Sequence, residues 1–331
     1  MNLLIIIIAL LIIKKLYLTY TPEHLQYCYI AMFVVIFFLS YRLNKNVHVS
    51  LMLALITVFG RTIYRYTTDA ESIKWPNNAY SIKNTILGIL AVIFVYIFNI
   101  YSKKKINMNV IKFINFILVF YIFFSCGEYI LHKYVMHMDK DGIIYKTLMK
   151  NKWLKYYFIT GIRDSHINHH LMVEKNMEVK KTIVENSDDE QSLYMGWTIT
   201  VWFLPLIFIT MNIVKKITQH NISQKNIFIS SAIISFLWQY IWNKTHVQMH
   251  NIENNYSIKK GPYDEGLLDL SYVTKLLYIN HKNHHLQKGE KKGNYNVIAL
   301  GADEWFNKNV KIVDNEDYCK DPNNQHEKVC Q

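Results

Sequence analysis

Long apolar stretches alternate with polar ones along this chain, and the alternation predicts helices that cross a membrane. Several stretches carry almost no charge and approach the roughly 20 residues that a helix needs to span a bilayer. The first, residues 3–19, ends without a small-residue cleavage site, which predicts a retained anchor rather than a removed signal sequence. The shortest ones also suit re-entrant or interfacial helices. The other predicted segments are 26–41, 49–60, 85–101, 110–131, 197–214 and 227–242.

The polar stretches between these segments divide the chain into three predicted parts. We expect residues 1–109 to form N-terminal transmembrane segments and residues 110–310 to form one domain that carries the chemistry. Residues 311–331 form a polar C-terminal tail. This organisation predicts a multi-pass membrane protein.

The formal net charge of the chain is +12, and a basic balance often indicates a nucleic-acid partner. Here the lysines lie mostly in the polar segments that flank the apolar ones. We therefore assign the charge to membrane topology and to anionic headgroups, and we expect no nucleic-acid partner. The four cysteines form no C-x-x-C pair, which gives no support for a zinc ribbon or a thioredoxin-type site.

Histidine supplies the candidate chemistry, because ten of the fourteen histidines fall into four short clusters. Two clusters repeat the spacing H-x-x-H-H and a third is an i, i+4 pair, and both spacings place side chains on one helical face. The members of the first cluster, His132 and His137, lie about 140° apart on an ideal helix. Either they bind different metals or the helix ends between them. The other clustered histidines are His166, His169, His170, His246, His250, His281, His284 and His285.

Ten imidazoles are more than one metal ion uses. Neutral imidazole suits zinc, copper and iron, whereas a structural zinc takes four ligands that commonly include cysteine. Shared between two ions, the ten side chains give about five nitrogens each and leave room for a ligand from outside the protein. The sequence therefore predicts a two-metal site. The remaining histidines, which we expect to be ordinary packed or surface residues, are His24, His48, His220 and His326.

A carboxylate accompanies the first cluster, since Glu128 lies four residues before His132. On a helix this spacing places both side chains on one face. Two interpretations are open at this point: Glu128 accepts a hydrogen bond that orients the imidazole, or it is a carboxylate at a helix end. Asp164 and Asp303 also lie near clusters, and the sequence assigns them no role.

All four clusters reach the same membrane face if 197–214 and 227–242 form a hairpin. The first cluster ends the segment 110–131, and the second follows it with no crossing between. The hairpin then returns the chain to the same side before the third and fourth clusters. The many lysines of 139–196 favour the cytoplasm, so we expect the histidine site to face the cytoplasm.

In their order along the chain, the clusters resemble the histidine boxes of the fatty acid hydroxylase superfamily of membrane-bound di-iron enzymes. Residues 128–137, EYILHKYVMH, are similar to the first box, and their Glu-Tyr and four-residue gap look most like the sphingolipid fatty acid 2-hydroxylases. HINHH at 166–170, THVQMH at 245–250 and HKNHH at 281–285 are similar to the other three boxes.

A closing signature extends the resemblance, which covers about residues 110–310. NYN at 294–296 and ADEWF at 302–306 look like the family's Asn-Phe-Gly and Trp-Asp-x-x-Phe elements. Asn296 and Ala302 stand where the family has Gly and Trp.

The resemblance implies an oxygen-dependent lipid oxidase with two iron ions bound by the ten clustered histidines, or with zinc in the isolated protein. We expect an all-α fold, a polytopic transmembrane helical bundle with a helical polar cap that encloses a histidine-rich dimetal centre. The substrate is an acyl, sphingoid or sterol chain in the bilayer, which O2 hydroxylates or desaturates. No heme domain precedes the membrane region, so a separate donor such as cytochrome b5 and its reductase supplies electrons. The expected location is the endoplasmic reticulum.

Two other interpretations stay open. A catalytically inactive zinc-binding scaffold keeps the boxes without redox chemistry, because imidazole binds zinc at least as well as ferrous iron. A metal transporter carries its ligands along transmembrane helices at bilayer depth, whereas these clusters lie at helix ends and in polar segments.

Overall fold

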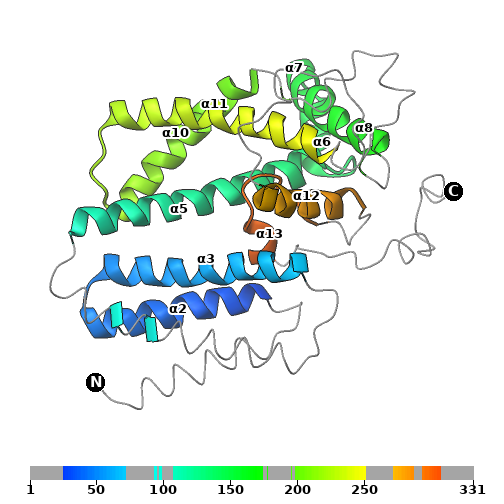
Figure 1. The fold of residues 1–331 in the computed structure, drawn as a ribbon. Coiled ribbons are helices and arrows are strands. Elements are labelled where there is room, and N and C mark those ends of the chain that lie inside the picture. The colour runs from blue at the N-terminus through cyan, green and yellow to red at the C-terminus, as the bar shows by residue number, and fades with distance from the viewer. Residues whose placement is uncertain are drawn as a thin grey trace. The chain divides into compact units, whose positions relative to one another are not determined.

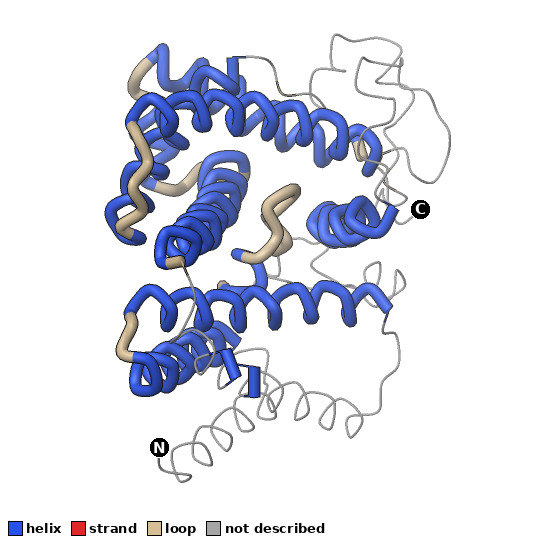
Figure 2. The backbone as a smooth tube through the Cα atoms, turned by 60° about the vertical axis from the view of Figure 1, so that its left-hand side comes forward, coloured by secondary structure: helices blue, strands red, loops and turns tan. Residues whose placement is uncertain are grey.

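The computed structural model of the chain is helical through most of the residues that it describes. Within these residues there are helices, turns and loops but no strand (Figure 2). The predicted all-α class is therefore confirmed for this part of the chain. The described residues are 25–71, 107–173, 198–250, 271–286 and 293–306, together with 93–94, 97–98, 177 and 195.

Most of the helical elements are α-helices, which carry the labels of Figure 1, and two are π-helical stretches named η2 and η3. In chain order the elements are α2 (Leu25–Asn44), α3 (Val47–Glu71), α5 (Met108–Leu131), η2 (His132–Met136), α6 (Ile143–Met149), α7 (Lys152–Leu154), η3 (Lys155–Asp164), α8 (Ser165–Met172), α10 (Thr198–Thr218), α11 (Gln224–Met249), α12 (Ser271–Leu286) and α13 (Ala302–Trp305).

The chain divides into two compact units. All four histidine clusters belong to the second unit. The division at 1–109, 110–310 and 311–331 stays a prediction. The first unit comprises Met1–Phe123, Ile209–Gln224 and Glu304–Asn307, and the second comprises Phe124–Phe208, Lys225–Asp303 and Lys308–Gln331.

The first unit is built around α2 and α3, which lie side by side (Figures 1 and 2). Between them Lys45 adopts a left-handed φ of 59°. The Asn46 side chain accepts hydrogen bonds from the backbone N–H groups of His48 and Val49 at 3.0 and 3.2 Å. These bonds satisfy donors in the first turn of α3 that have no partner within the helix, so they define where this helix starts.

The interior of this helix pair is apolar. Met32, Ile36 and Leu53 are buried in one cluster with Ile111 of α5, and the Trp305 side chain packs against it. Because each buried apolar side chain contributes roughly 1.5–3 kcal/mol, this cluster accounts for the cohesion of the first unit. The Trp305 indole N–H also donates to Thr62 Oγ1 at 2.9 Å.

The second unit has an aromatic core next to the histidines. Trp238, Trp242 and Met249 of α11 pack with Leu277 of α12 and with Val297. Both helices continue from this core into histidine clusters, at 246–250 on α11 and at 281–285 on α12. The core therefore fixes the positions of two histidine-bearing helices relative to each other.

Two helical stretches are long and apolar enough to cross a membrane, namely Met108–Met136 and Ile199–Thr218. Only 28% and 17% of their most apolar windows are buried inside the protein. Most of their apolar surface therefore faces outward, unlike that of a core helix in a soluble protein. These stretches contain most of the predicted segments 110–131 and 197–214.

The other predicted segments have different outcomes. Those at 26–41 and 49–60 fall in α2 and α3, whose apolar parts are only 10–17 residues long. The one at 227–242 lies within α11 and is helical, but it is not among the helices that meet the length and hydropathy required of a span. The segment at 3–19 and most of 85–101 lie outside the described residues.

Candidate metal centre

The structure brings all ten clustered histidines together, and they form two groups. The candidate ligand nitrogens of group 1 all lie within 4.8 Å of one another, and the same is true among four members of group 2. His285 completes group 2, because its Nε2 atom lies 3.2 Å from that of His169 and 3.0 Å from that of His281. Group 1 consists of His132, His137, His166, His170 and His284. Group 2 consists of His169, His246, His250, His281 and His285.

A π-helical turn places His132 and His137 in the same group. The backbone N–H of His137 donates to the carbonyl of His132 at 3.0 Å, which is the i→i+5 bond of a π-helix. Residues five apart therefore lie about one turn apart and on the same side, instead of about 140° apart as on an α-helix. His132 and His137 therefore lie in the same group, and the α-helix changes to a π-helical turn between them.

Each H-x-x-H-H cluster supplies both groups. On α8, His166 and His170 belong to group 1, while His169 between them belongs to group 2. On α12 the assignment is reversed: His281 lies in group 2 with His285, and His284 lies in group 1. Helical spacing explains the division, because residues i and i+4 share a face that residue i+3 does not fully share.

The nitrogens of group 1 are too close together for hydrogen bonding alone. Nε2 of His166 lies 3.0 Å from those of His132 and His137 and 3.1 Å from that of His170. A neutral imidazole carries only one N–H, so His166 cannot donate in all three contacts. Converging nitrogen lone pairs repel one another unless a cation lies among them, and this set of donors therefore fits a metal ion.

The ring positions in group 1 fit a square-based shell better than a tetrahedral one. With metal–nitrogen bonds of about 2.1 Å, the centres of adjacent rings in an octahedron are about 4.5 Å apart and those of opposite rings about 6.4 Å, whereas a tetrahedron gives about 5.2 Å throughout. The rings of His166 and His284 are 6.3 Å apart. The ring of His137 lies 4.6 and 4.9 Å from these two.

Group 2 repeats this arrangement. The rings of His169 and His281 are 6.4 Å apart and nearly parallel, so they stand opposite each other. The ring of His250 lies 4.7 and 5.2 Å from them. Each group thus has an opposite pair with another histidine beside it, and five nitrogens around one ion would leave room for a ligand from outside the protein.

Burial keeps several of these imidazoles neutral. His169, His250 and His281 are each at most 1% exposed. Burial, together with neighbouring imidazoles, holds their pKa well below the usual value of 6.5. A neutral imidazole is the form that binds a metal ion, because the proton and the ion compete for the same lone pair.

A short segment before α13 orients two ligands of group 1. His132 Nδ1 donates to the Tyr295 carbonyl at 2.5 Å, and His284 Nδ1 donates to the Gly293 carbonyl at 2.7 Å. A hydrogen on Nδ1 leaves the lone pair on Nε2, so these carbonyls select the tautomer that binds a metal. Residue 294 between them adopts a left-handed φ of 58°, which asparagine tolerates better than most residues.

Asp303 holds this segment in place. Its two carboxylate oxygens accept from the backbone N–H groups of Tyr295 and Asn296, each at 2.7 Å. The backbone N–H of Asp303 donates in return to Oδ1 of Asn296 at 3.0 Å. Burial raises the pKa of Asp303 to about 7, although the two backbone donors favour its charged form. Asp303 therefore acts on the carbonyl that orients His132.

Glu128 acts on the same segment from α5. Its buried carboxylate accepts from the backbone N–H groups of Ile298 and Ala299 at 3.2 and 2.8 Å and from Nδ2 of Asn296 at 3.3 Å. Glu128 is therefore linked to His132 through the 293–301 segment. This role differs from both interpretations of Glu128 that the sequence offered.

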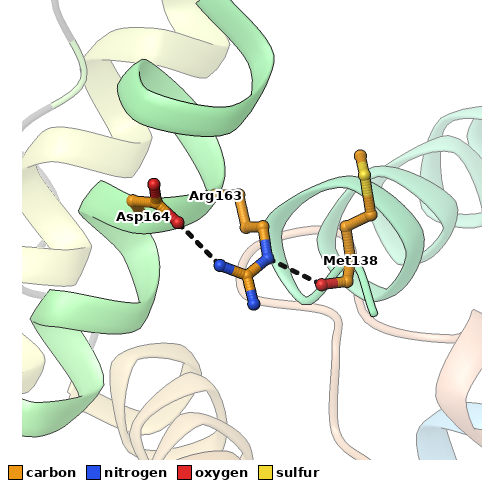
Figure 3. A network of polar contacts seen from close by, with 3 residues as sticks. All are labelled: Met138, Arg163 and Asp164. Atoms are coloured by element: carbon orange, nitrogen blue, oxygen red, sulfur yellow. Dashed lines mark hydrogen bonds and ion pairs between the residues drawn. The ribbon is translucent and has the colours of Figure 1, made fainter. Parts of the chain in front are cut away.

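Arg163 connects the two π-helical regions (Figure 3). Its Nε donates to the carbonyl of Met138, just after η2, at 2.7 Å, and its Nη1 pairs with Asp164 at 2.6 Å. Arg163 itself lies in η3, immediately before the histidines of α8. The guanidinium thus ties the end of the first histidine cluster to the start of the second.

The histidines outside the clusters lie elsewhere. His220 is in the first unit, where its ring contacts Phe113 and Phe116 at centre distances of 5.5 and 5.6 Å. His48 follows the α2–α3 turn. His24 and His326 lie outside the described residues.

Sequence spacing alone did not identify the polar residues that hold the 293–303 segment in place. Asn280 donates from Nδ2 to the Asn296 carbonyl at 2.5 Å, and Ser125 Oγ accepts from the Ala302 N–H at 2.9 Å. The sequence indicated this region through the closing signature at 294–296 and 302–306 and through Asp303, to which it assigned no role.

Comparison of the chain with protein-family models, with curated protein sequences and with solved structures finds no match in any of the three.

Proposed function

We propose that this protein is a membrane-bound di-iron lipid oxidase that uses O2 to hydroxylate or desaturate an acyl, sphingoid or sterol chain. The observation that carries the proposal is the contact of His166 Nε2 with three other Nε2 atoms at 3.0–3.1 Å, since a cation among these lone pairs would account for all three contacts, which the single N–H of His166 cannot. The resemblance of the four histidine clusters to the boxes of the fatty acid hydroxylase superfamily supplies the reaction class. We take the ten clustered histidines as ligands of two iron ions.

The donor set supports redox chemistry over a purely structural ion. Structural zinc prefers four ligands in a tetrahedron, and the opposite pairs at 6.3 and 6.4 Å depart from that shape. Iron in a nitrogen-rich shell supplies activation of O2 and removal of hydrogen from an unactivated C–H bond, which side-chain acids and bases cannot achieve.

The protein's own residues prepare the site in two ways. The carbonyls of Gly293 and Tyr295 hold Nδ1 protonated on His284 and His132 and so keep Nε2 available. Burial lowers the pKa of His169, His250 and His281 and so keeps these imidazoles neutral. Hydroxylation inserts one oxygen atom of O2 into the C–H bond and releases the other as water, which consumes two electrons and two protons. We infer a separate electron donor, such as cytochrome b5 and its reductase.

Membrane location completes the proposal. The outward-facing apolar stretches Met108–Met136 and Ile199–Thr218 suit two membrane-spanning helices, and we propose a polytopic bundle whose polar cap encloses the histidine centre. The first of these stretches ends next to His137, so a lipid chain in the bilayer has a short path to the ions. We place the protein in the endoplasmic reticulum with the histidine centre facing the cytoplasm.

The inactive zinc scaffold is the second candidate, because the same imidazoles bind zinc. Two groups of five histidines favour the zinc scaffold as much as they favour an oxidase. The square-based ring positions do not favour the scaffold. A metal transporter is less well supported, because the described ligands gather in one centre instead of following a path along a helix.

The test is lipid mass spectrometry on cells that express the intact chain or the double variant His169→Ala, His284→Ala, which removes one ligand from each group. We expect a lipid that is heavier by one oxygen, or lighter by two hydrogens, only with the intact chain. The matched control is His220→Ala, which removes a histidine outside both groups and should keep the product. No lipid change together with stoichiometric zinc under iron-replete expression would support the scaffold instead.

A further inference from the structure

We propose that the two groups hold their ions unequally, and that group 1 binds its ion more tightly than group 2. The inference rests on the proposed metal centre and goes beyond it, because it concerns what surrounds the ligands rather than the ligands themselves. Each group offers five imidazoles with similar ring positions, so the ligand count does not distinguish them. The hydrogen-bond partners of the Nδ1 atoms distinguish the two groups.

Group 1 has ligands that are oriented before an ion arrives. His132 and His284 donate from Nδ1 to the carbonyls of Tyr295 and Gly293 at 2.5 and 2.7 Å. Both carbonyls belong to the segment 293–301, which precedes α13. A ring that is anchored at Nδ1 keeps its Nε2 lone pair pointing into the group, so little conformational freedom is lost when the ion binds.

Group 2 lacks this support at its central pair. His169 and His281, whose rings stand opposite each other, are buried, and within the described part of the chain neither Nδ1 has a hydrogen-bond partner. His250 is anchored by the Met177 carbonyl at 3.0 Å. Without an acceptor at Nδ1, the tautomer and rotation of His169 and His281 are set only by packing, so ion binding must order them.

Two carboxylates make the support of group 1 rigid. Asp303 accepts from the N–H groups of Tyr295 and Asn296 at 2.7 Å, and Glu128 accepts from that of Ala299 at 2.8 Å. The carboxylates thus hold this segment at residues 295–296 and at residue 299. We assign Asp303 as a positioning residue for group 1, because it acts on His132 through the Tyr295 carbonyl.

The expected difference in affinity is measurable. Loss of the partner that orients a metal-bound histidine costs about 10–100-fold in metal affinity. Group 1 has two such partners on one segment, whereas group 2 has one in the Met177 carbonyl and holds both of the buried Nδ1 atoms that lack a partner in the described residues. We therefore expect dissociation constants that differ at least tenfold.

The experiment titrates the full-length chain, purified in detergent and stripped with a chelator, with Zn²⁺ in competition with a chromophoric chelator. The intact chain should bind two equivalents in two separated steps. His284→Ala should remove the tight step and leave the weak one, and His281→Ala should do the reverse. Helical circular dichroism and thermal unfolding of each variant show whether the protein still folds.

The two single variants also exclude a simpler cause of unequal steps. If two equivalent sites differed only because the first ion repels the second, then the one ion left in either variant would bind with the tight affinity. That result would overturn the inference, as would loss of the tight step in His281→Ala. A chain that binds no Zn²⁺ at all would instead refute the proposed metal centre.

A substitution outside both groups tests the role of the segment and leaves all ten ligands intact. Asp303→Asn replaces one carboxylate oxygen with an amide N–H₂ that faces a backbone donor, so it should weaken the tight step 10–100-fold and leave the weak step unchanged. Asp141→Asn makes the same change of charge at an exposed position and should alter neither step. Equal weakening of both steps by Asp303→Asn would show general damage to the fold and would contradict the assignment.

Discussion

Between α2 and α3 the most deeply buried side chains include Met32, Ile36 and Leu53. At the histidine centre they include His169 and His281, and all five side chains are at most 1% exposed. The apolar side chains gain free energy from leaving water. The imidazoles lose hydration, and the Nδ1 atoms of His169 and His281 find no replacement partner in the described residues. Equal depth of burial thus has opposite energetic consequences in the two units.

The difference predicts that only the histidine centre depends on a bound ion for its stability. The core around α2 and α3 is formed by apolar side chains, whereas the histidine centre carries buried polar atoms whose desolvation costs about 1–3 kcal/mol each. A bound cation would leave these Nδ1 atoms without a partner, but coordination of the converging Nε2 lone pairs would offset the cost. We therefore expect the second unit to depend on its ligands for stability and the first unit not to.

Removal of metal should give the largest effect. An ion present at about a thousand times its dissociation constant stabilises the folded state by about 4 kcal/mol, and this contribution should disappear after treatment with a chelator. Hydrogen exchange of the purified protein should accelerate in α8 and α12 and stay unchanged in α2 and α3. Equal acceleration in all four helices would mean that the two interiors do not differ in this way.

A cavity in the apolar core should give the next largest effect. Leu53 is completely buried, so Leu53→Ala should lower the free energy of unfolding of the first unit by about 2–5 kcal/mol. Metal content, measured by elemental analysis, should not change. Ile63→Ala on the same helix is the control, because Ile63 is 62% exposed and its truncation should cost far less.

Sequence reasoning identified the ten histidines that the structure brings together but not how they divide into two groups. Clusters of histidine at helical spacing are a local pattern, and local patterns can be read from one segment. His169 belongs to one group and His166 and His170 to the other. This division depends on the position of α12, and no local sequence pattern gives that position. The pairing of His132 with His137 needed a π-turn, and residue spacing alone gives no sign of one.

The supporting segment was harder still to predict. Glu128 was noticed because it lies one turn before His132, yet it binds backbone N–H groups about 170 residues away. Backbone donors and acceptors have no signature in the sequence, so such partners become visible only in the fold. The helices at 26–41, 49–60 and 227–242 were recognised as apolar segments, but hydropathy did not decide whether they cross a membrane.

Replacement of a buried ligand by an apolar residue should separate stability from metal binding. His281→Leu removes a buried imidazole whose Nδ1 has no partner in the described residues. We expect the chelated variant to be more stable than the chelated intact chain by about 1 kcal/mol, while the stabilisation by added metal becomes smaller. Thermal unfolding with and without Zn²⁺ measures both quantities. A chelated variant that is less stable than the intact chain would indicate that packing of the imidazole outweighs its desolvation.

The smallest expected effect concerns a polar contact between α13 and α3. The Trp305 indole N–H donates to Thr62 Oγ1 at 2.9 Å, and the ring packs against Phe59 at a centre distance of 5.7 Å. Trp305→Phe keeps an aromatic ring and removes the donor, so it should lower the free energy of unfolding by about 1 kcal/mol without change in metal content. Thr62→Val removes the acceptor from the other side, and the double variant should cost less than the sum of the two single ones. Strict additivity would show that the hydrogen bond contributes nothing. A fall in metal content would show instead that Trp305, two residues after Asp303, helps to hold the segment that orients His132.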